Sequence, residues 1–196
     1  MMEIRSAGPD DFGRITEITT RAFADDPVMR WFFPDRDEYE RLHPVFNEWQ
    51  CRRWHATDSL WVTADLLAMA GWIPPGRPET DVGPDPGLEH PTWRLERFEA
   101  IGAAVAANTP SEPHWYLHML ATDPDAQQRG RGAALMGAVF ATADADDLPC
   151  YLETESEANV RYYRHHGFDV RSEWDVPLDG PRMWGMLRPA GGTIER

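Results

Sequence analysis

The segment Gln127-Gln128-Arg129-Gly130-Arg131-Gly132 has the residue types of an anion site. Two glycines separated by one residue, directly before a segment of helical spacing, let the backbone approach a ligand closely. The free N–H groups of a first helical turn point outward, and the helix dipole adds partial positive charge. Phosphate is the most natural occupant, with Arg129 and Arg131 as two further charges. The spacing differs from the G-x-G-x-x-G of a dinucleotide site and from a Walker loop.

The elements on both sides of this segment would hold it in place. Residues 114–122 are rich in aromatic and apolar side chains and contain no Gly or Pro, which predicts a strand. Asp123-Pro124-Asp125 ends the strand, because Pro donates no ladder hydrogen bond. Apolar residues at helical spacing then continue to about residue 145. The pattern therefore predicts a strand, a turn and a Gly-rich entry into a helix.

Composition limits the classes of function. With 196 residues, of which 42% are apolar, the chain is long enough for one domain with a sizeable core. The formal net charge of −14 argues against nucleic-acid binding as the main task. It is compatible with a cationic partner such as an amine, and solubility explains it equally well. Arg129 and Arg131 are a local exception in an acidic chain.

The two cysteines, Cys51 and Cys150, lie far apart and lack metal-ligand spacing, so we expect no structural zinc and no metal. The N-terminus lacks the apolar stretch of a signal peptide, and the longest apolar runs are too short to span a membrane. We therefore expect a soluble protein in the reducing cytoplasm, without nucleic-acid or membrane partners. A homodimer is compatible with the sequence.

Periodicity predicts a mixed α/β single domain over residues 1–196. Pro44 should either kink its helix or mark the start of a second piece. Residues 74–87 hold five Pro and three Gly and are interpreted as a loop, with a lid over a pocket as one role. The predicted strands are 2–7, 60–63, 66–73, 114–122, 148–154, 168–176 and 183–187; the predicted helices are 11–23, 35–55, 88–107, the one ending near 145, and 156–166.

Two motifs together resemble the GNAT superfamily of N-acetyltransferases. Gln-x-x-Gly-x-Gly, after a strand that ends in Asp-Pro, resembles the acetyl-CoA pyrophosphate loop of that family. One helix and one strand later, Tyr163-Arg164-His165-His166-Gly167-Phe168 resembles its second motif. The resemblance covers the C-terminal two-thirds of the chain well and the rest in element order. Three shorter pieces resemble the branch that contains puromycin N-acetyltransferase: 113–117, 152–154 and Asn159-x-x-x-Tyr163.

The resemblance implies the GNAT fold, with a mixed central sheet of about six or seven strands that splays between the fourth and fifth and is flanked by helices. It also implies acetyl-CoA as the acyl donor. The superfamily often has Asn seven residues before the tyrosine, where this chain has Ser156, and Asn159 stands four before it. The implied cofactor-binding residues are Leu120, Ala121, Thr122, Gln128, Arg129, Gly130, Arg131, Gly132, Ala133 and Asn159.

Catalytic roles follow from the same resemblance. Tyr163 occupies the family position of the acid that protonates the leaving thiolate, and its alternative role is a core aromatic. Glu153 is the first candidate for the general base, and a structural role is at least as well supported. Glu155 and His118 come next as candidates for the base. Main-chain N–H groups of residues 120–122 would stabilise the oxyanion.

The resemblance implies transfer of acetyl from acetyl-CoA to a primary amine by direct attack. A small-molecule acceptor is favoured by the branch resemblance and by the Trp-rich first half of the chain. Asp25 and Asp26 would either meet a substrate ammonium or form the turn at a helix end. One alternative is a protein N-terminal or lysine acetyltransferase with an open groove. Another is a non-catalytic acyl-CoA-binding regulatory domain without a working acid and base.

Overall fold

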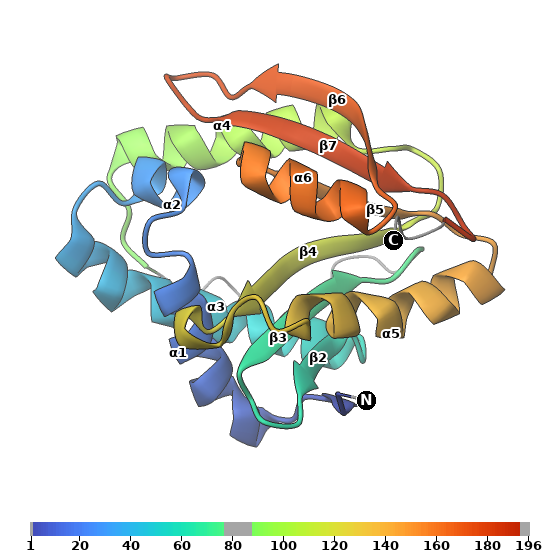
Figure 1. Ribbon diagram of the computed structural model, residues 1–196. Coiled ribbons are helices and arrows are strands. Elements are labelled where there is room, and N and C mark those ends of the chain that lie inside the picture. Colours follow the sequence, from blue (N-terminus) through green and yellow to red (C-terminus); the bar gives the residue numbers. More distant parts are fainter. Residues whose placement is uncertain (1, 77–87, 193–196) are drawn as a thin grey trace.

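The computed structural model describes residues 2–76 and 88–192. Seven strands form one sheet in the order β1-β2-β3-β4-β5-β7-β6 (Figure 1). Neighbouring strands are antiparallel, except that β4 and β5 are parallel. The strands are β1 (Ile4–Ser6), β2 (Leu60–Thr63), β3 (Ala68–Ile73), β4 (Trp115–Thr122), β5 (Cys150–Thr154), β6 (Asp169–Asp175) and β7 (Arg182–Arg188).

Helices cover both faces of the sheet (Figure 1). On the face of the sheet that α5 and α6 cover, buried side chains form one hydrophobic cluster. On the opposite face, α1 and α3 pack against β2, β3 and β4 and form a second cluster. A third cluster joins α2, α3 and α4. The helices are α1 (Phe12–Ala22), α2 (Pro27–Phe32), α3 (Arg36–Ala56), α4 (Thr92–Asn108), α5 (Arg131–Ala145) and α6 (Glu157–His165), with short 3-10 turns η1 (Pro9–Asp11) and η2 (Pro124–Ala126).

Local sequence signals explain where several helices begin. The carboxylate of Asp26 accepts a hydrogen bond from the Met29 N–H at 2.9 Å, which caps the N-terminus of α2. Asp35 caps α3 in the same way through the Glu38 N–H. Pro44 lies inside α3, and the helix continues through it as one element. The capped start of α2 fixes the backbone beside the site described below.

A β-bulge in β4 opens the sheet. Strand β4 pairs with β5 only at Trp115 and Tyr116. Directly beyond this point, consecutive residues of β3 pair with Leu117 and Met119, so that His118 is an extra residue on β4. Such a bulge bends its strand and increases the local twist. The bend accounts for the divergence of β4 from β5. The site described below lies at the opening between these two strands.

The predicted α/β fold, with a sheet of six or seven strands that splays between the fourth and fifth, is confirmed. The strands predicted at 60–63 and 66–73 form the antiparallel hairpin β2–β3, and those predicted at 168–176 and 183–187 form the antiparallel hairpin β6–β7. The predicted loop at 74–87 falls largely on residues 77–87, which lie outside the described residues, so its role as a lid stays a prediction.

Candidate active site

The loop between β4 and α5 has the backbone of an open cradle. Gln128 and Gly130 have φ angles of 59° and 77°, and these turns lead directly into the N-terminus of α5. A Cβ atom on Gly130 would meet no atom within 4 Å, so the loop surface is open. A Cβ atom on Gly132 would lie 2.7 Å from the hydroxyl of Tyr162. A larger residue at this position would therefore displace the Tyr162 side chain where α6 approaches the start of α5.

The two arginines of this loop have different surroundings. Arg131 is engaged by the turn between β2 and β3, where its Nη2 lies 2.7 Å from Oδ2 of Asp65. Its Nη1 also donates to the carbonyl of Ala126. The Arg131 hydrogen bond lowers the pKa of Asp65. Arg129 is exposed. Of the two side chains expected to assist with phosphate, Arg129 is available and Arg131 is committed to holding the loop.

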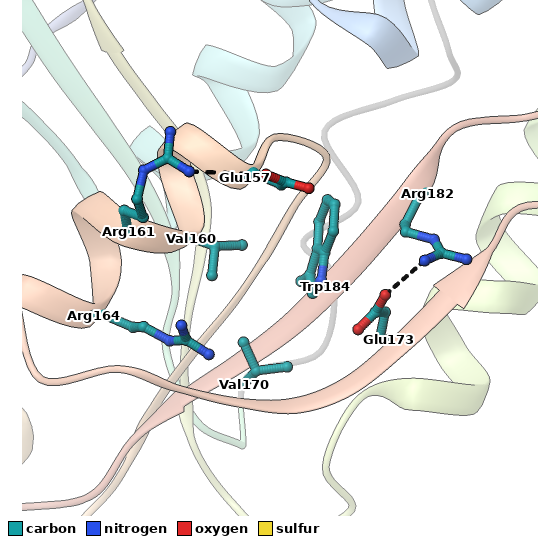
Figure 2. Close-up of a pocket in the computed structure, with 8 residues that line it drawn as sticks. All are labelled: Glu157, Val160, Arg161, Arg164, Val170, Glu173, Arg182 and Trp184. Carbon is teal, nitrogen blue, oxygen red and sulfur yellow. Dashed lines mark hydrogen bonds and ion pairs between the residues drawn. The ribbon is translucent and has the colours of Figure 1, made fainter.

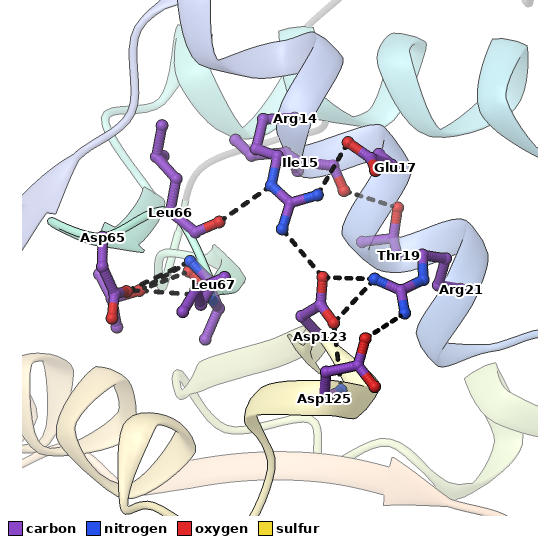
Figure 3. Close-up of polar contacts among 12 residues, drawn as sticks. Arg14, Ile15, Glu17, Thr19, Arg21, Asp65, Leu66, Leu67, Asp123 and Asp125 are labelled. Atoms are coloured by element: carbon purple, nitrogen blue, oxygen red, sulfur yellow. Dashed lines mark hydrogen bonds and ion pairs between the residues drawn. The ribbon is translucent and has the colours of Figure 1, made fainter.

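Asp123 connects α1 to the start of the same loop (Figure 3). Its carboxylate is 2% exposed and lies 2.9 Å from Arg14 and 2.8 Å from Arg21. Burial acts to raise the pKa of Asp123, but hydrogen bonds from the Asp125 N–H and from Arg14 hold it below its usual range. Two guanidinium groups on α1 therefore fix the turn that follows β4.

The register of β4 determines which main-chain donors face the opening. The Asp123 N–H donates to the Leu67 carbonyl at 2.9 Å, and Ala121 pairs with β3 two residues earlier. N–H groups alternate in direction along an antiparallel strand. The Ala121 N–H therefore points toward β3, whereas those of Leu120 and Thr122 point toward the diverging β5. Of the main-chain N–H groups of residues 120–122 that were expected to face the opening, only those of Leu120 and Thr122 do so.

A cavity of about 440 Å³ lies on the opposite face of the sheet from α5. Its walls come from α1, α2, α4 and the diverging ends of β4 and β5. Three carboxyl groups line it, those of Asp26, Glu153 and Glu155, and none of the described residues that line it is Arg or Lys. A cavity of this charge suits a cation of small-molecule size. The Gly-rich loop and the acidic cavity thus lie on opposite faces of the sheet, on either side of the opening between β4 and β5.

Glu153 lies among three hydroxyl groups. Those of Tyr116 and Tyr151 interact with its carboxylate, although the Tyr151 hydroxyl also lies 3.3 Å from the Asn108 carbonyl, and the Thr109 hydroxyl lies 3.5 Å from its Oε1. Burial raises the pKa of Glu153, and the three hydroxyl groups oppose that shift because they stabilise the ionised form. The arrangement gives a desolvated carboxylate that is held in one position at the cavity wall.

Glu155 and Asp26 form a carboxyl–carboxylate pair across the opening. The protonated Glu155 donates a hydrogen bond to Asp26, which also accepts from the Met29 N–H. Burial, followed by the charge of Asp26, raises the pKa of Glu155 to about 9. The two groups share one proton at neutral pH, since two desolvated carboxylates in contact cannot both ionise readily. Sequence analysis named both residues separately and missed the pair.

This pair predicts an unusual dependence of stability on pH. The pKa of Glu155 is about 9 in the folded protein and 4.5 as the ordinary value. The folded state therefore binds more protons across this window, and the free energy of unfolding falls as pH rises through it. Glu155→Gln keeps a neutral donor for Asp26 and removes this titration. In chemical denaturation between pH 5 and 9, the free energy of unfolding of Glu155→Gln should rise relative to that of wild type by up to about 1.4 kcal/mol per pH unit.

A matched change tests the cause. Glu157→Gln removes an exposed carboxyl group at the start of α6 and should leave the slope of stability against pH unchanged. Parallel pH curves for wild type and Glu155→Gln would show that Glu155 carries no raised pKa.

Tyr163 lies on the α6 side of the sheet, half-buried against Phe168, with their ring centroids 5.8 Å apart. Burial raises the pKa of Tyr163, and the charge that Glu155 carries when ionised raises it further. The hydroxyl therefore keeps its proton at neutral pH. Glu155 follows the end of β5, so Tyr163 lies within electrostatic range of the residue that borders the opening.

The remaining predicted residues are dispersed. Asn159 is exposed on α6, and Tyr162 has its hydroxyl over Gly132. His118 is the bulged residue of β4 and lines the acidic cavity, with its ring 5.5 Å from that of Trp54. The rings of Trp54 and Tyr116 both pack against His118. This position is compatible with a structural role in the cavity wall and with a role as general base.

A separate cavity of about 340 Å³ lies between α6 and the β6–β7 hairpin (Figure 2). Its charges are largely paired with one another: Arg182 lies 2.9 Å from Glu173, and Arg161 lies 3.8 Å from Glu157. Compensated charges leave little net field for a ligand. The acidic cavity at the opening is therefore the stronger candidate.

An anion cradle and an acidic cavity that meet through a splayed sheet define the architecture of an acyltransferase. Residues 20–168 match the family described as the acetyltransferase (GNAT) family, and the chain belongs to it. The prediction of an N-acetyltransferase of this family is confirmed at that level. The described residues contain no group of three or more His, Cys, Asp or Glu able to hold a metal ion. Among the described helices, none has the length and apolar character to cross a bilayer.

Similar proteins support the same family. The mycothiol acetyltransferase of Acidimicrobium ferrooxidans is 30% identical over 164 residues, which cover 78% of this chain and 48% of that protein. The chain thus spans about half the length of this curated relative. A crystal structure described as histone acetyltransferase HPA2 and related acetyltransferase, from Corynebacterium glutamicum, has a TM-score of 0.71 at 23% identity and covers 100% of both chains. PaiA N-acetyltransferase from Thermoplasma acidophilum, in complex with coenzyme A, has a TM-score of 0.57 at 11% identity and covers 96% of this chain and 99% of that chain. The two structures show likeness of fold.

Proposed function

We propose that this protein transfers an acetyl group from acetyl-CoA to a primary amine of a small molecule within a ternary complex. The observation that carries the proposal is the position of the acidic cavity. Asp26, Glu153 and Glu155 line it at the point where β4 leaves β5, on the face opposite the Gly-rich cradle. Donor and acceptor would therefore reach the opening from opposite faces of the sheet.

The cradle fits the acyl donor. Main-chain N–H groups of residues 129–133, together with Gln128 and the exposed Arg129, would hold the pyrophosphate. The N–H groups of Leu120 and Thr122 would bind the pantetheine arm and the thioester oxygen, as the ladder of an added strand does. Asn159 would contribute from α6. A coenzyme A complex of the structural neighbour PaiA supports the same donor here.

Acetyl-CoA supplies an activated acyl thioester that an amine lone pair attacks with expulsion of the thiolate. An alkyl amine with a pKa of about 10.4 is mostly protonated at pH 7, so freeing its lone pair costs roughly 4–5 kcal/mol. Glu153 would accept that proton, directly or through water, from its fixed position at the cavity wall. Tyr163 would donate its proton toward the leaving sulfur.

Direct attack of the amine on the thioester, without an acyl-enzyme, agrees with the burial and protonation of both cysteines. Cys51 and Cys150 are buried free thiols, and burial raises the pKa of each to about 12. A thiol that stays protonated is a poor nucleophile, so neither suits an acyl-enzyme. Free thiols also agree with the reducing cytoplasm as the expected location.

A small-molecule acceptor is supported by the size of the carboxyl-lined cavity, about 440 Å³, and by the branch resemblance at 113–117 and 152–154. A protein acetyltransferase would instead offer an open groove. A non-catalytic acyl-CoA-binding domain would bind the donor without turning it over.

An amine-panel assay with detection of the released thiol tests the reaction. The chain contains no Lys, so acetylation of its own lysine side chains cannot raise the background. Release of thiol only in the presence of a small amine would support the proposal. Turnover only with peptides would favour the protein acetyltransferase. No turnover with any amine, despite tight binding of acetyl-CoA, would favour the binding domain.

Acetyl-CoA should stabilise the protein against heat. At a concentration of about one hundred times Kd, a ligand that binds only the folded state adds about 2.7 kcal/mol. For a domain of this size, that corresponds to a rise in Tm of roughly 5–10 °C. Pantetheine, which lacks the pyrophosphate, should give a much smaller shift. Arg129→Gln should reduce the shift, whereas Arg131→Gln should mainly lower the Tm of the ligand-free protein. Absence of any shift at millimolar acetyl-CoA would contradict the donor assignment.

A further inference from the structure

A second cavity, of about 480 Å³, adjoins the acidic one. Helices α2, α3 and α4 form its walls, largely with aromatic rings. Phe32 and Phe98 lie edge to face with centroids 4.5 Å apart, and Phe46 and Trp49 lie 5.8 Å apart on α3. Aromatic walls of this kind bind apolar groups through area burial and ring contacts.

The two cavities share part of their lining. Met29 of α2 and Ile101 and Gly102 of α4 face both of them. No atom lies within 4 Å of a Cβ built on Gly102, so the wall is open at this position. A molecule whose amine lies beside Asp26, Glu153 and Glu155 would therefore extend into the aromatic cavity past Gly102.

The polar groups that the structure describes around the second cavity include no carboxyl group. His43 is 1% exposed and bonds to the Thr20 hydroxyl at 2.9 Å, and burial lowers its pKa to about 4, so it is neutral. Arg53 packs its guanidinium over Trp49 at 4.7 Å and donates to Gln50. The aromatic cavity therefore lacks the carboxylate character of its neighbour. One cavity suits a cation, and the other suits an uncharged ring or chain.

Given the proposed reaction, on which this inference rests, we propose that the acceptor is a monoamine with a bulky, uncharged aromatic or aliphatic body. Its ammonium group occupies the carboxyl-lined cavity, and its body occupies the cavity formed by α2, α3 and α4. The junction at Met29, Ile101 and Gly102 determines how large the body can be. A polyamine would place a second ammonium group in a cavity whose described lining includes the Arg53 guanidinium and no carboxyl group, which costs desolvation energy without a counter-charge.

Calorimetric binding of three amines in the presence of coenzyme A tests this inference. Ethylamine and 2-phenylethylamine carry the same ammonium and differ in the ring, and spermidine adds charge instead. Wild type should bind 2-phenylethylamine at least about tenfold more tightly than ethylamine, the discrimination that a fitted apolar pocket provides. Gly102→Leu should abolish most of this preference, because its side chain would fill the junction. Gly137→Leu is the matched control, at an exposed position of α5 that is also open around its Cβ.

The outcomes separate this inference from the proposed reaction. Equal affinity of wild type for ethylamine and 2-phenylethylamine would overturn the inference, as would tighter binding of spermidine. A preference that survives in Gly102→Leu would also overturn it. Thiol release is measured in parallel with the same amines. The predicted binding pattern without thiol release would support the aromatic cavity and contradict the proposed acetyl transfer.

Discussion

Replacing Tyr163 by Phe is expected to lower the turnover of acetyl-CoA by about 10²-fold or more, with little change in its Kd. A general acid contributes on the order of 10²–10⁴ to rate, and Phe removes only the hydroxyl group. Packing against Phe168 is retained, so the fold should not change. Steady-state kinetics and isothermal titration of acetyl-CoA provide the two measurements.

The raised pKa of Tyr163 refines its expected role. Ordinary values place a tyrosine about 1.5 units above a thiol, which makes proton transfer to the thiolate slightly uphill. Burial raises the pKa of Tyr163 further, so full transfer becomes harder. We therefore expect Tyr163 to act mainly by donating a hydrogen bond to the sulfur as negative charge develops.

Tyr162→Phe is the matched control, because this neighbouring residue has the same side chain in a different place. Its hydroxyl lies over Gly132, beside the proposed pyrophosphate cradle. The loss of this hydroxyl should alter the affinity for acetyl-CoA more than turnover. A larger loss of turnover in Tyr162→Phe than in Tyr163→Phe would reassign the acid to Tyr162.

Sequence patterns predicted the features that depend on local structure. The Gly-rich loop and the Tyr163-x-x-x-Gly167-Phe168 motif each lie within one short segment, and the periodicity of α1 and the β2–β3 hairpin is also local. Their geometry follows from glycine conformation and helix spacing, which a sequence displays directly. These signals were sufficient to predict the Gly-rich turn and the helix that follows it, whereas the splayed sheet was implied by the resemblance to the GNAT family.

Other features of the site depend on distant segments and could not be predicted in this way. Asp26 and Glu155 meet only because α2 packs across the end of β5, and each carboxyl alone has an ordinary local explanation. The pairing of Arg131 with Asp65 likewise joins α5 to a turn more than sixty residues earlier. The bulge at His118 appears only in the register between β3 and β4. Charged groups from distant segments, Asp26 beside Glu155 and Asp65 beside Arg131, therefore modify the roles that the sequence suggests for Glu155 and Arg131.

The general base can be assigned by comparing two isosteric changes. Glu153→Gln is expected to lower kcat/KM by about 10²-fold or more at pH 7, if Glu153 removes the ammonium proton. The loss should shrink as pH approaches the amine pKa of about 10.4, because the free amine then needs no base. The raised pKa of Glu153 should also shift the acidic limb of the wild-type profile above the usual range of a carboxyl group.

Glu155→Gln should behave differently, because Glu155 already holds a proton at neutral pH. The amide of Gln can donate to Asp26 in place of the protonated carboxyl, so activity at pH 7 should be largely retained. Any change of rate that wild type shows near pH 9 should be absent from the variant. Asp26→Asn serves as the control for the pair, since it removes the remaining negative charge while preserving shape.

The pH profiles of these variants distinguish the mechanisms. A large loss in Glu155→Gln at pH 7, with Glu153→Gln nearly normal, would assign the base to the Asp26–Glu155 pair. Glu153 would then be a structural partner of Tyr116, Tyr151 and Thr109. Near-normal profiles for both variants would point to water or His118. The decisive property is which carboxyl group is ionised when the amine arrives. Burial raises the pKa of both glutamates, but hydroxyl groups stabilise the ionised form of Glu153, whereas the charge of Asp26 opposes ionisation of Glu155, only two residues away along the chain.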